Sequence, residues 1–167
     1  MIRSSCLGFA VCVFCIGVIQ AQVKEAGICP PNWKHHGSNC YLIVTGPMLN
    51  WRDAVNYCQT VSAEIIEIET VEENTYLKNS LLHNHTTVDI WVGATDARQE
   101  GHWLWTNSQQ PVKFTDWAPN EPYQGHGFEC MTLTARQGFR WNDEDCNHKW
   151  GYICKKEALN EGTIIIG

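Results

Sequence analysis

The chain has 167 residues, of which 44% are apolar and 18% charged, a composition that favours a packed core over a disordered chain. Its formal net charge is −6, from 12 basic and 18 acidic residues, and no basic run exceeds the pair Lys155–Lys156. Binding to nucleic acid needs clustered cations that displace counterions, so this class of function is excluded.

The first 21 residues have the features of a secretory signal peptide. Arg3 supplies the positively charged start, residues 7–19 form an apolar run, and a small residue precedes the expected cleavage site. An uncleaved membrane anchor is the alternative, although the run is short for a span, which needs ~20 apolar residues. The sequence therefore predicts a secreted, extracellular protein without membrane insertion, whose mature chain begins near Gln22 with a short tail at 22–28.

Taken in chain order, the mature sequence first predicts a hairpin loop and a short strand. Cys29 and Cys40 bracket a loop rich in proline and glycine, of a size that suits a local disulfide staple. Residues 41–44 form an apolar strand run, and Gly46-Pro47 is expected to break it. These patterns place a small hairpin at the start of the domain.

Two helices follow. The first is predicted over residues 50–60, where Asn50 can cap the N-terminus and apolar side chains fall on one face. The second is predicted over residues 71–82, where Thr70 and Glu73 have the spacing of a capping box. Each segment therefore carries its own start signal.

Beyond the second helix the pattern changes to short strands and a long loop. Residues 95–128 are rich in Gly, Asn, Gln, Pro and Trp, and a loop of this length inside a compact domain is usually functional. Helices first and strands afterwards indicate one α+β domain. The predicted strands are 90–94, 103–106, 130–134, 139–141 and 151–155.

The cysteine count supports an extracellular fold. Three of the nine cysteines lie in the signal peptide and six remain in the mature chain. An even number in a secreted chain predicts three disulfides and no free thiol, but counting does not fix their pairing. No C-x2-C pair is present in the mature chain, so a zinc–thiolate site is not expected. The six are Cys29, Cys40, Cys58, Cys130, Cys146 and Cys154.

Seven segments in register resemble the C-type lectin-like domain family, and together they cover residues 29–155. The resemblance implies an α+β fold with two helices, short antiparallel sheets, a long ligand-binding loop and three disulfides, expected over 29–157 with a tail at 158–167. It implies the pairs Cys29–Cys40, Cys58–Cys154 and Cys130–Cys146. The segments are Cys29–Trp33, Trp51–Cys58, Trp91–Ala94, Trp105, Asp116–Pro122, Trp141–Asp143 and Gly151–Cys154.

The resemblance also implies a primary calcium site. Calcium takes six to eight oxygen ligands, and in sugar-binding members of the family the sugar's vicinal hydroxyls supply two of them. Glu121, Asn142 and Asp143 match the family's ligand positions. The family's acid two residues before the cysteine is replaced by Phe128, and Glu129 next to it is expected to help. The alternative is that these are solvated loop residues that hold no calcium.

The family's triplet of Glu, Pro and Asn is altered here at its last position. Pro122 is expected to follow a cis peptide, but Tyr123 lacks the amide oxygen that would bind calcium. Glu121 resembles the mannose-type pattern, whereas Tyr123 and His126 could instead stack on an apolar sugar face. The expected carbohydrate-binding residues are thus Glu121, Tyr123, His126, Glu129, Asn142 and Asp143.

Two further sites are indicated. Asp96 and Glu100 match part of a second calcium site found in some family members, in which Gln124 replaces an acid; otherwise they cap a loop. Asn84-His-Thr is an acceptor sequence for N-glycosylation.

The function that follows is a secreted lectin that binds glycans on cell surfaces or glycoproteins, with calcium as its cofactor. A homo-oligomer would have to form by surface packing, without an intermolecular disulfide. The alternatives are a module that binds sugar without calcium, and one that binds a protein or a mineral through a degenerate sugar site. The sequence has no catalytic motif of a hydrolase, so an enzyme is not expected.

Overall fold

The computed structural model describes residues 27–123 and 125–159, so the predicted signal peptide lies outside the described residues, as do most of both predicted tails. Within the described residues no helix has the length and apolar character that crossing a membrane requires. The elements are β1 (Lys34–His36), β2 (Asn39–Leu49), α1 (Trp51–Thr60), β3 (Glu64–Ile65), α2 (Val71–His83), β4 (Ile90–Thr95), β5 (Leu104–Trp105), β6 (Cys130–Thr134), a 3-10 turn (Ala135–Gln137), β7 (Arg140–Glu144) and β8 (Trp150–Glu157).

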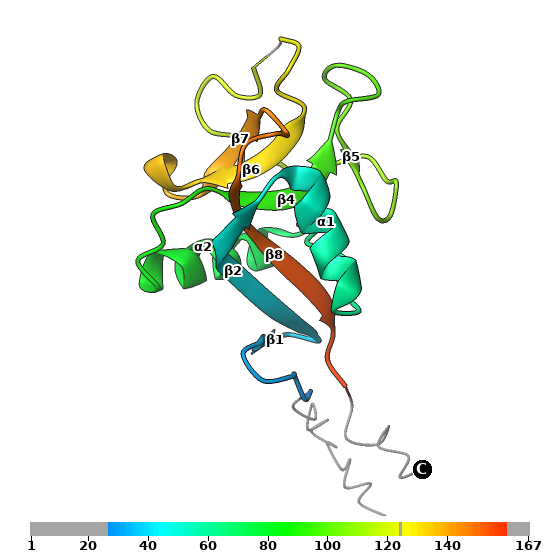
Figure 1. Cartoon of the computed structure of the whole chain (residues 1–167). Coiled ribbons are helices and arrows are strands. Elements are labelled where there is room, and N and C mark those ends of the chain that lie inside the picture. Colours follow the sequence, from blue (N-terminus) through cyan, green and yellow to red (C-terminus); the bar gives the residue numbers. More distant parts are fainter. Residues whose placement is uncertain (1–26, 124, 160–167) are drawn as a thin grey trace, which may run out of the picture.

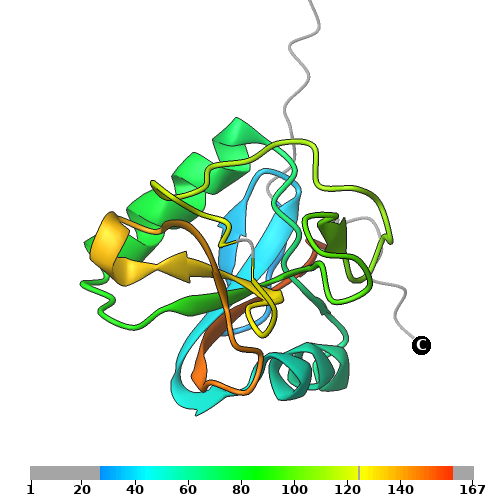
Figure 2. The same cartoon turned by 90° about the horizontal axis from the view of Figure 1, so that it is seen from above.

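The strands form one mixed sheet, flanked by the two helices (Figures 1 and 2). The strand order is β1-β2-β8-β4-β6-β7, with β3 added on β8 and β5 on β4. Every pairing is antiparallel except that of β4 with β8, a parallel pair that the expected antiparallel sheets did not include. With two helices and three disulfides, the predicted α+β fold class is confirmed.

Both helices begin where their capping residues predict. The Asn50 side chain accepts a hydrogen bond from the backbone N–H of Asp53 over 2.8 Å, and the Thr70 hydroxyl accepts one from Glu73 over 3.2 Å. The second half of the capping box is absent, because the Glu73 carboxylate turns inward. It accepts hydrogen bonds from the Tyr41 hydroxyl at 2.8 Å and from Lys155 Nζ at 2.7 Å. Glu73 therefore links α2 to the sheet through Oε1, while its Oε2 accepts from the Glu69 N–H just before the helix over 3.5 Å and not from Thr70.

The predicted end of the first strand at Gly46-Pro47 is wrong. Strand β2 runs on to Leu49, with an irregularity in its pairing to β8 between Val44 and Leu49. The Gly46–Pro47 peptide is cis, which lets the chain bend at this irregularity and resume pairing beyond it. The short strands β1 and β3 were not predicted as strands, because residues 34–36 and 64–65 are too few to show a pattern.

Strand β4 lies at the centre of the sheet and explains the Trp-Val-Gly-Ala segment. The indole N–H of Trp91 donates to the Leu49 carbonyl over 2.8 Å, and that of Trp51 donates to the Val92 carbonyl over 2.8 Å. A Cβ at Gly93 would lie 3.0 Å from the Ile66 carbonyl oxygen, so this close approach of backbone to backbone requires glycine.

The three disulfides have the predicted pairing: Cys29–Cys40, Cys58–Cys154 and Cys130–Cys146. The second joins α1 to β8 across 96 residues of sequence, and both of its sulfur-bearing residues are fully buried. It therefore closes almost the whole domain into one loop.

The segment 106–129 between β5 and β6, called the long loop below, is fixed to α2 by a buried amide. Asn74 donates to the Asp116 carboxylate over 2.8 Å and accepts from the Trp141 indole over 2.9 Å. Lys78 Nζ also contacts Asp116 Oδ2 at 2.6 Å. The long loop lies at one end of the molecule (Figure 1).

The two ends of the described chain meet at the opposite end of the molecule from the long loop (Figure 1). Ile28 and Leu159 form a two-way backbone bridge, with N···O distances of 2.8 and 3.0 Å. Ordered pairing thus extends past both expected domain limits, at 29 and 157.

Candidate functional site

The long loop is joined to β7 at the predicted calcium residues. The Glu121–Pro122 peptide is cis, as the sequence predicts. The next residue, Tyr123, donates its backbone N–H to the Asp143 carboxylate over 3.1 Å. The cis peptide and this hydrogen bond bring Glu121 next to Asp143, although 20 residues separate Tyr123 from Asp143 in sequence.

Glu121 and Asp143 form an uncompensated pair of acids. Burial and the neighbouring Asp143 carboxyl raise the pKa of Glu121 to about 7. Asp143 is only 4% exposed, and its Oδ2 atom is buried without a hydrogen-bond partner. A buried carboxylate oxygen without a donor is costly, and the described residues leave this negative charge unbalanced.

Asn142 is connected to the same place through the backbone of β7. Its side-chain amide donates to the Asp143 carbonyl over 2.6 Å, and its own carbonyl accepts from the Thr132 hydroxyl over 3.3 Å. Neighbouring residues of a strand point to opposite faces. The Asn142 side chain accordingly lines a hollow with Arg136 and Glu144, on the opposite face from Asp143.

Asp96 and Glu100 lie within electrostatic reach of this pair. Asp96 is 3% exposed; its Oδ2 accepts from the Gly101 N–H over 2.8 Å, and its Oδ1 has no partner. Burial raises the pKa of Asp96, and the charges of Glu100 and Asp143 raise it further. The residues expected for the second calcium site therefore adjoin those expected for the first.

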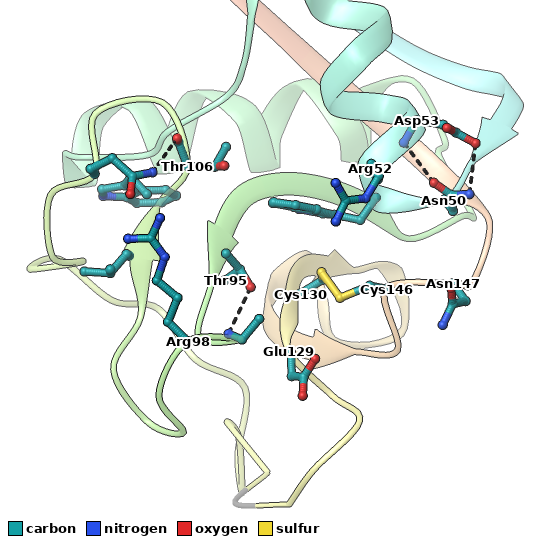
Figure 3. A pocket seen from close by; sticks show the side chains of 15 residues that line it. Asn50, Arg52, Asp53, Thr95, Arg98, Thr106, Glu129, Cys130, Cys146 and Asn147 are labelled. Carbon is teal, nitrogen blue, oxygen red and sulfur yellow. Dashed lines mark hydrogen bonds between the residues drawn. A yellow bond between two sulfur atoms is a disulfide. The ribbon is translucent and has the colours of Figure 1, made fainter.

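Glu129 does not join the acids. Phe128 and Glu129 lie just before β6, and their side chains have different surroundings. Phe128 contacts the Tyr123 ring, whereas Glu129 lines a separate pocket beside the Cys130–Cys146 disulfide (Figure 3). The small shift of the loop that would bring Glu129 to Asp143 is not seen.

An aromatic pair borders the acids instead. The rings of Tyr123 and Phe128 meet edge to face with centroids 5.7 Å apart, and their residues are 58% and 39% exposed. A Cβ at Gly125 would collide with the Tyr123 ring, so glycine lets the ring lie against the backbone. His126 is separate from this pair: its exposed ring lies 3.9 Å from Glu100. Phe128 was not among the predicted binding residues, although an exposed aromatic residue after Gly127 was a usable signal.

The described residues contain no group of three or more His, Cys, Asp and Glu side chains arranged to hold a metal ion. The donor set nevertheless fits a hard cation. Two carboxylate oxygens, on Asp96 and Asp143, are buried without partners, and the pKa of Glu121 is raised. A bound cation would compensate the negative charge of all three groups. Glu121 and Asp143 supply the carboxylate oxygen atoms that calcium prefers, whereas the Asn142 side chain lies on the other face of β7.

The glycosylation acceptor lies away from this site. Asn84 is the exposed C-cap of α2, next to His85 with its positive φ of 51°, and it lines a shallow hollow beside β2. This position is open to an attached glycan.

Comparisons with known proteins place the whole region in one family. The model of the lectin C-type domain matches residues 47–156. The perlucin-like protein of Mytilus galloprovincialis is 31% identical over 131 residues, covering 75% of this chain and 81% of that protein. The chain spans less than half the length of several other curated relatives.

Solved structures agree with the family model. The carbohydrate-recognition domain of the mouse scavenger receptor C-type lectin superposes with a TM-score of 0.71 and 30% identity, over 79% of this chain and 98% of that one. A calcium-independent type II antifreeze protein has a TM-score of 0.71 and 26% identity, over 81% and 99%. The same fold thus occurs in a carbohydrate-recognition domain and in a calcium-independent antifreeze protein.

Proposed function

The chain belongs to the C-type lectin domain family, and on this premise we propose that it is a secreted lectin that binds glycans with the help of calcium. Proteins of this family are binding proteins and not enzymes. The observation that carries the calcium proposal is the pair of acids Glu121 and Asp143, whose charge no cationic group among the described residues balances.

Glu121 and Asp143 would hold the ion, and Asn142 would join them by turning its side chain away from the hollow that it lines on the other face of β7. A bound calcium offers open coordination positions to two neighbouring sugar hydroxyls. The chain's own part is to aim the carboxylates, through the cis peptide before Pro122 and the hydrogen bond from Tyr123 N–H to Asp143. Glu129 is left out of this set because its side chain lines another pocket. Asp96 and Glu100 would support a second ion next to the first.

Tyr123 would contact the sugar rather than the ion. Its ring is exposed beside Asp143 and backed by Phe128, which suits stacking on the C–H face of a sugar. Glu121 favours a mannose-type arrangement of hydroxyls. His126, which is exposed at the edge of the same loop, would contact an extended glycan.

The same proposal includes the setting in which the lectin works. The signal-peptide pattern at 1–21 and the disulfides support secretion, since disulfides form in oxidising compartments. Exposed Asn84 would carry an N-glycan, and loss of an electrophoretic shift in Asn84→Gln would demonstrate it. A single shallow site binds weakly, so several copies, associated through surface packing, would supply avidity for cell-surface glycans.

A second candidate is a binding module that recognises a protein or mineral without calcium. Tyr123 and Phe128 stand at two positions where the family pattern has residues with oxygen ligands. One solved structure with the same fold is a calcium-independent type II antifreeze protein. On this reading the exposed aromatic pair would be the contact surface.

A glycan-binding screen of the mature protein, run with calcium and with a chelator, tests the proposal. We expect binding to hexose-bearing glycans that is lost with the chelator and restored by added calcium. Binding that survives the chelator would overturn the role of calcium. No binding to any glycan in either condition would favour the second candidate.

A further inference from the structure

We propose that the pocket beside the Cys130–Cys146 disulfide, called the side pocket below, is a second binding site that takes an acidic saccharide independently of calcium. The side pocket has a volume of about 540 Å³, within the range of small-ligand sites. The start of α1, the β4–β5 hairpin and the disulfide form its walls, so segments far apart in sequence build it (Figure 3).

Two arginines without partners face this pocket. Arg52 comes from the first turn of α1 and Arg98 from the loop after β4, and Figure 3 shows their side chains on opposite sides of the pocket. In the described chain neither guanidinium makes a hydrogen bond or an ion pair, whereas Arg140 and Lys78 both contact Asp116. Paired guanidinium groups of this kind bind carboxylate and sulfate oxygens.

The position of Arg52 is not explained by helix stability. The N-terminus of a helix carries a partial positive charge, which disfavours a cation in the first turn. The acid in that turn, Asp53, is hydrogen-bonded to the Asn50 side chain and does not pair with Arg52. A cation held at an unfavourable place, next to a pocket, indicates an anionic ligand.

The remaining wall groups favour a saccharide over a simple anion. Within the described residues the Glu129 carboxylate makes no hydrogen bond or ion pair, and it would accept hydrogen bonds from hydroxyl groups, which an inorganic anion such as sulfate lacks. Leu104 and Trp51, both partly exposed, supply apolar surface for the C–H face of a sugar ring. The ligand that offers an anionic group, hydroxyls and an apolar face together is a sugar bearing sulfate or carboxylate.

The side pocket is separate from the proposed calcium site. Phe128 contacts the Tyr123 ring whereas Glu129 lines the side pocket, and Asp96 lies near Asp143 while its neighbours Thr95 and Ala97 line the pocket. With a net charge of −6, the whole protein does not attract polyanions by its overall field. Binding of an acidic saccharide would therefore have to come from a local group of cations.

The test is calorimetry on the mature protein in a chelator, with oligosaccharides of equal length that carry sulfate, uronate or no charge. We expect the charged sugars to bind and the neutral one not to bind. Arg98→Gln and Arg52→Gln should each weaken binding about tenfold, the effect of losing one charge-assisted hydrogen bond. Comparison of the sulfated and uronate sugars identifies which anion is preferred.

Arg136→Gln is the matched control, because Arg136 is also exposed and unpaired but lines a different hollow. Equal weakening in Arg136→Gln, or no binding of either acidic sugar, would overturn the proposal. Inorganic sulfate that displaces the sugar completely at equal concentration would reduce the site to an anion site and overturn the saccharide part. Loss of binding in Asp143→Asn would assign the ligand to the calcium site instead, whereas unchanged binding there keeps the two proposals distinct.

Discussion

The backbone N–H of Tyr123 donates to one carboxylate oxygen of Asp143 over 3.1 Å, while the other oxygen is buried without a partner beside Glu121. The hydrogen bond thus fixes the long loop on β7 and also orients an unbalanced charge. Fixing a loop to present a buried charge lowers stability unless a ligand compensates it. The relationship therefore gives predictions for both stability and binding.

Asp143→Asn should abolish calcium-dependent glycan binding and, in a chelator, raise the free energy of unfolding by about 1 kcal/mol. The amide can still accept from Tyr123 N–H, and it replaces a buried charge next to Glu121. Calorimetry with a glycan and denaturant unfolding measure the two effects. Exposed Glu64→Gln is the control, and retention of calcium-dependent binding in Asp143→Asn would contradict the proposed site.

The calcium-free protein should lose stability as the pH rises from 5 to 8. The pKa of Glu121 is about 7 in the folded protein and ~4.3 in an unfolded chain, so the folded state binds its proton more tightly. This contribution is full below the unfolded value and is lost as the pH rises through the folded value. Urea unfolding at several pH values should show the slope, and Glu121→Gln should reduce it, whereas exposed Glu157→Gln should not.

Tyr123→Asn should tighten calcium binding and shift sugar preference toward mannose. The amide oxygen supplies a ligand that the phenol lacks at the position next to Pro122. Titration of calcium into both proteins measures the change, with the wild type expected near a dissociation constant of roughly 10⁻⁴–10⁻³ M. A Phe128→Tyr variant keeps an aromatic ring and should bind calcium as the wild type does. Equal calcium affinity in Tyr123→Asn would show that position 123 does not face the ion.

Replacing Cys58 and Cys154 by alanine should cost more stability than replacing Cys29 and Cys40. The first pair closes 96 residues and the second only 11, so in the chain-entropy model the losses are about 4–5 and about 3 kcal/mol. Both Cys58 and Cys154 are fully buried, which adds a packing loss. Thermal unfolding of the two double variants gives the order, and the reverse order would contradict it.

Asn74→Ala should destabilise the domain by about 2–3 kcal/mol and loosen the long loop. The change leaves the Trp141 indole N–H and one contact of Asp116 without their partner. Exposed Asn79→Ala on the same helix is the control and should be nearly neutral. Hydrogen exchange of residues 114–118 should rise in Asn74→Ala alone.

The sequence predicted correctly those features of the fold that depend on a few neighbouring residues, such as the starts of the two helices. Asn50 and Thr70 set the helix starts because each cap needs only its own turn. The cis peptide before Pro122 and the disulfide pairs followed from the resemblance to the family and are confirmed. The strand end at Gly46-Pro47 failed because pairing with β8 carries β2 past its local breaker.

The site was harder to predict, because side-chain direction depends on register. Glu129 adjoins the expected ligand position in sequence, but its side chain lines the side pocket instead. Glu73 has capping-box spacing, yet Tyr41 and Lys155 bind its carboxylate more favourably. Arg52 and Arg98 lie in separate segments without a shared motif, so only the folded chain brings them to one pocket.

The backbone bridge between Ile28 and Leu159 has a practical consequence for assays. Both ends of the domain emerge side by side, remote from the long loop (Figure 1). A biosensor surface or a fused scaffold attached at either end would therefore leave the long loop and the proposed glycan site free. In tandem copies joined through these ends, the long loop of each copy would point away from the point of attachment.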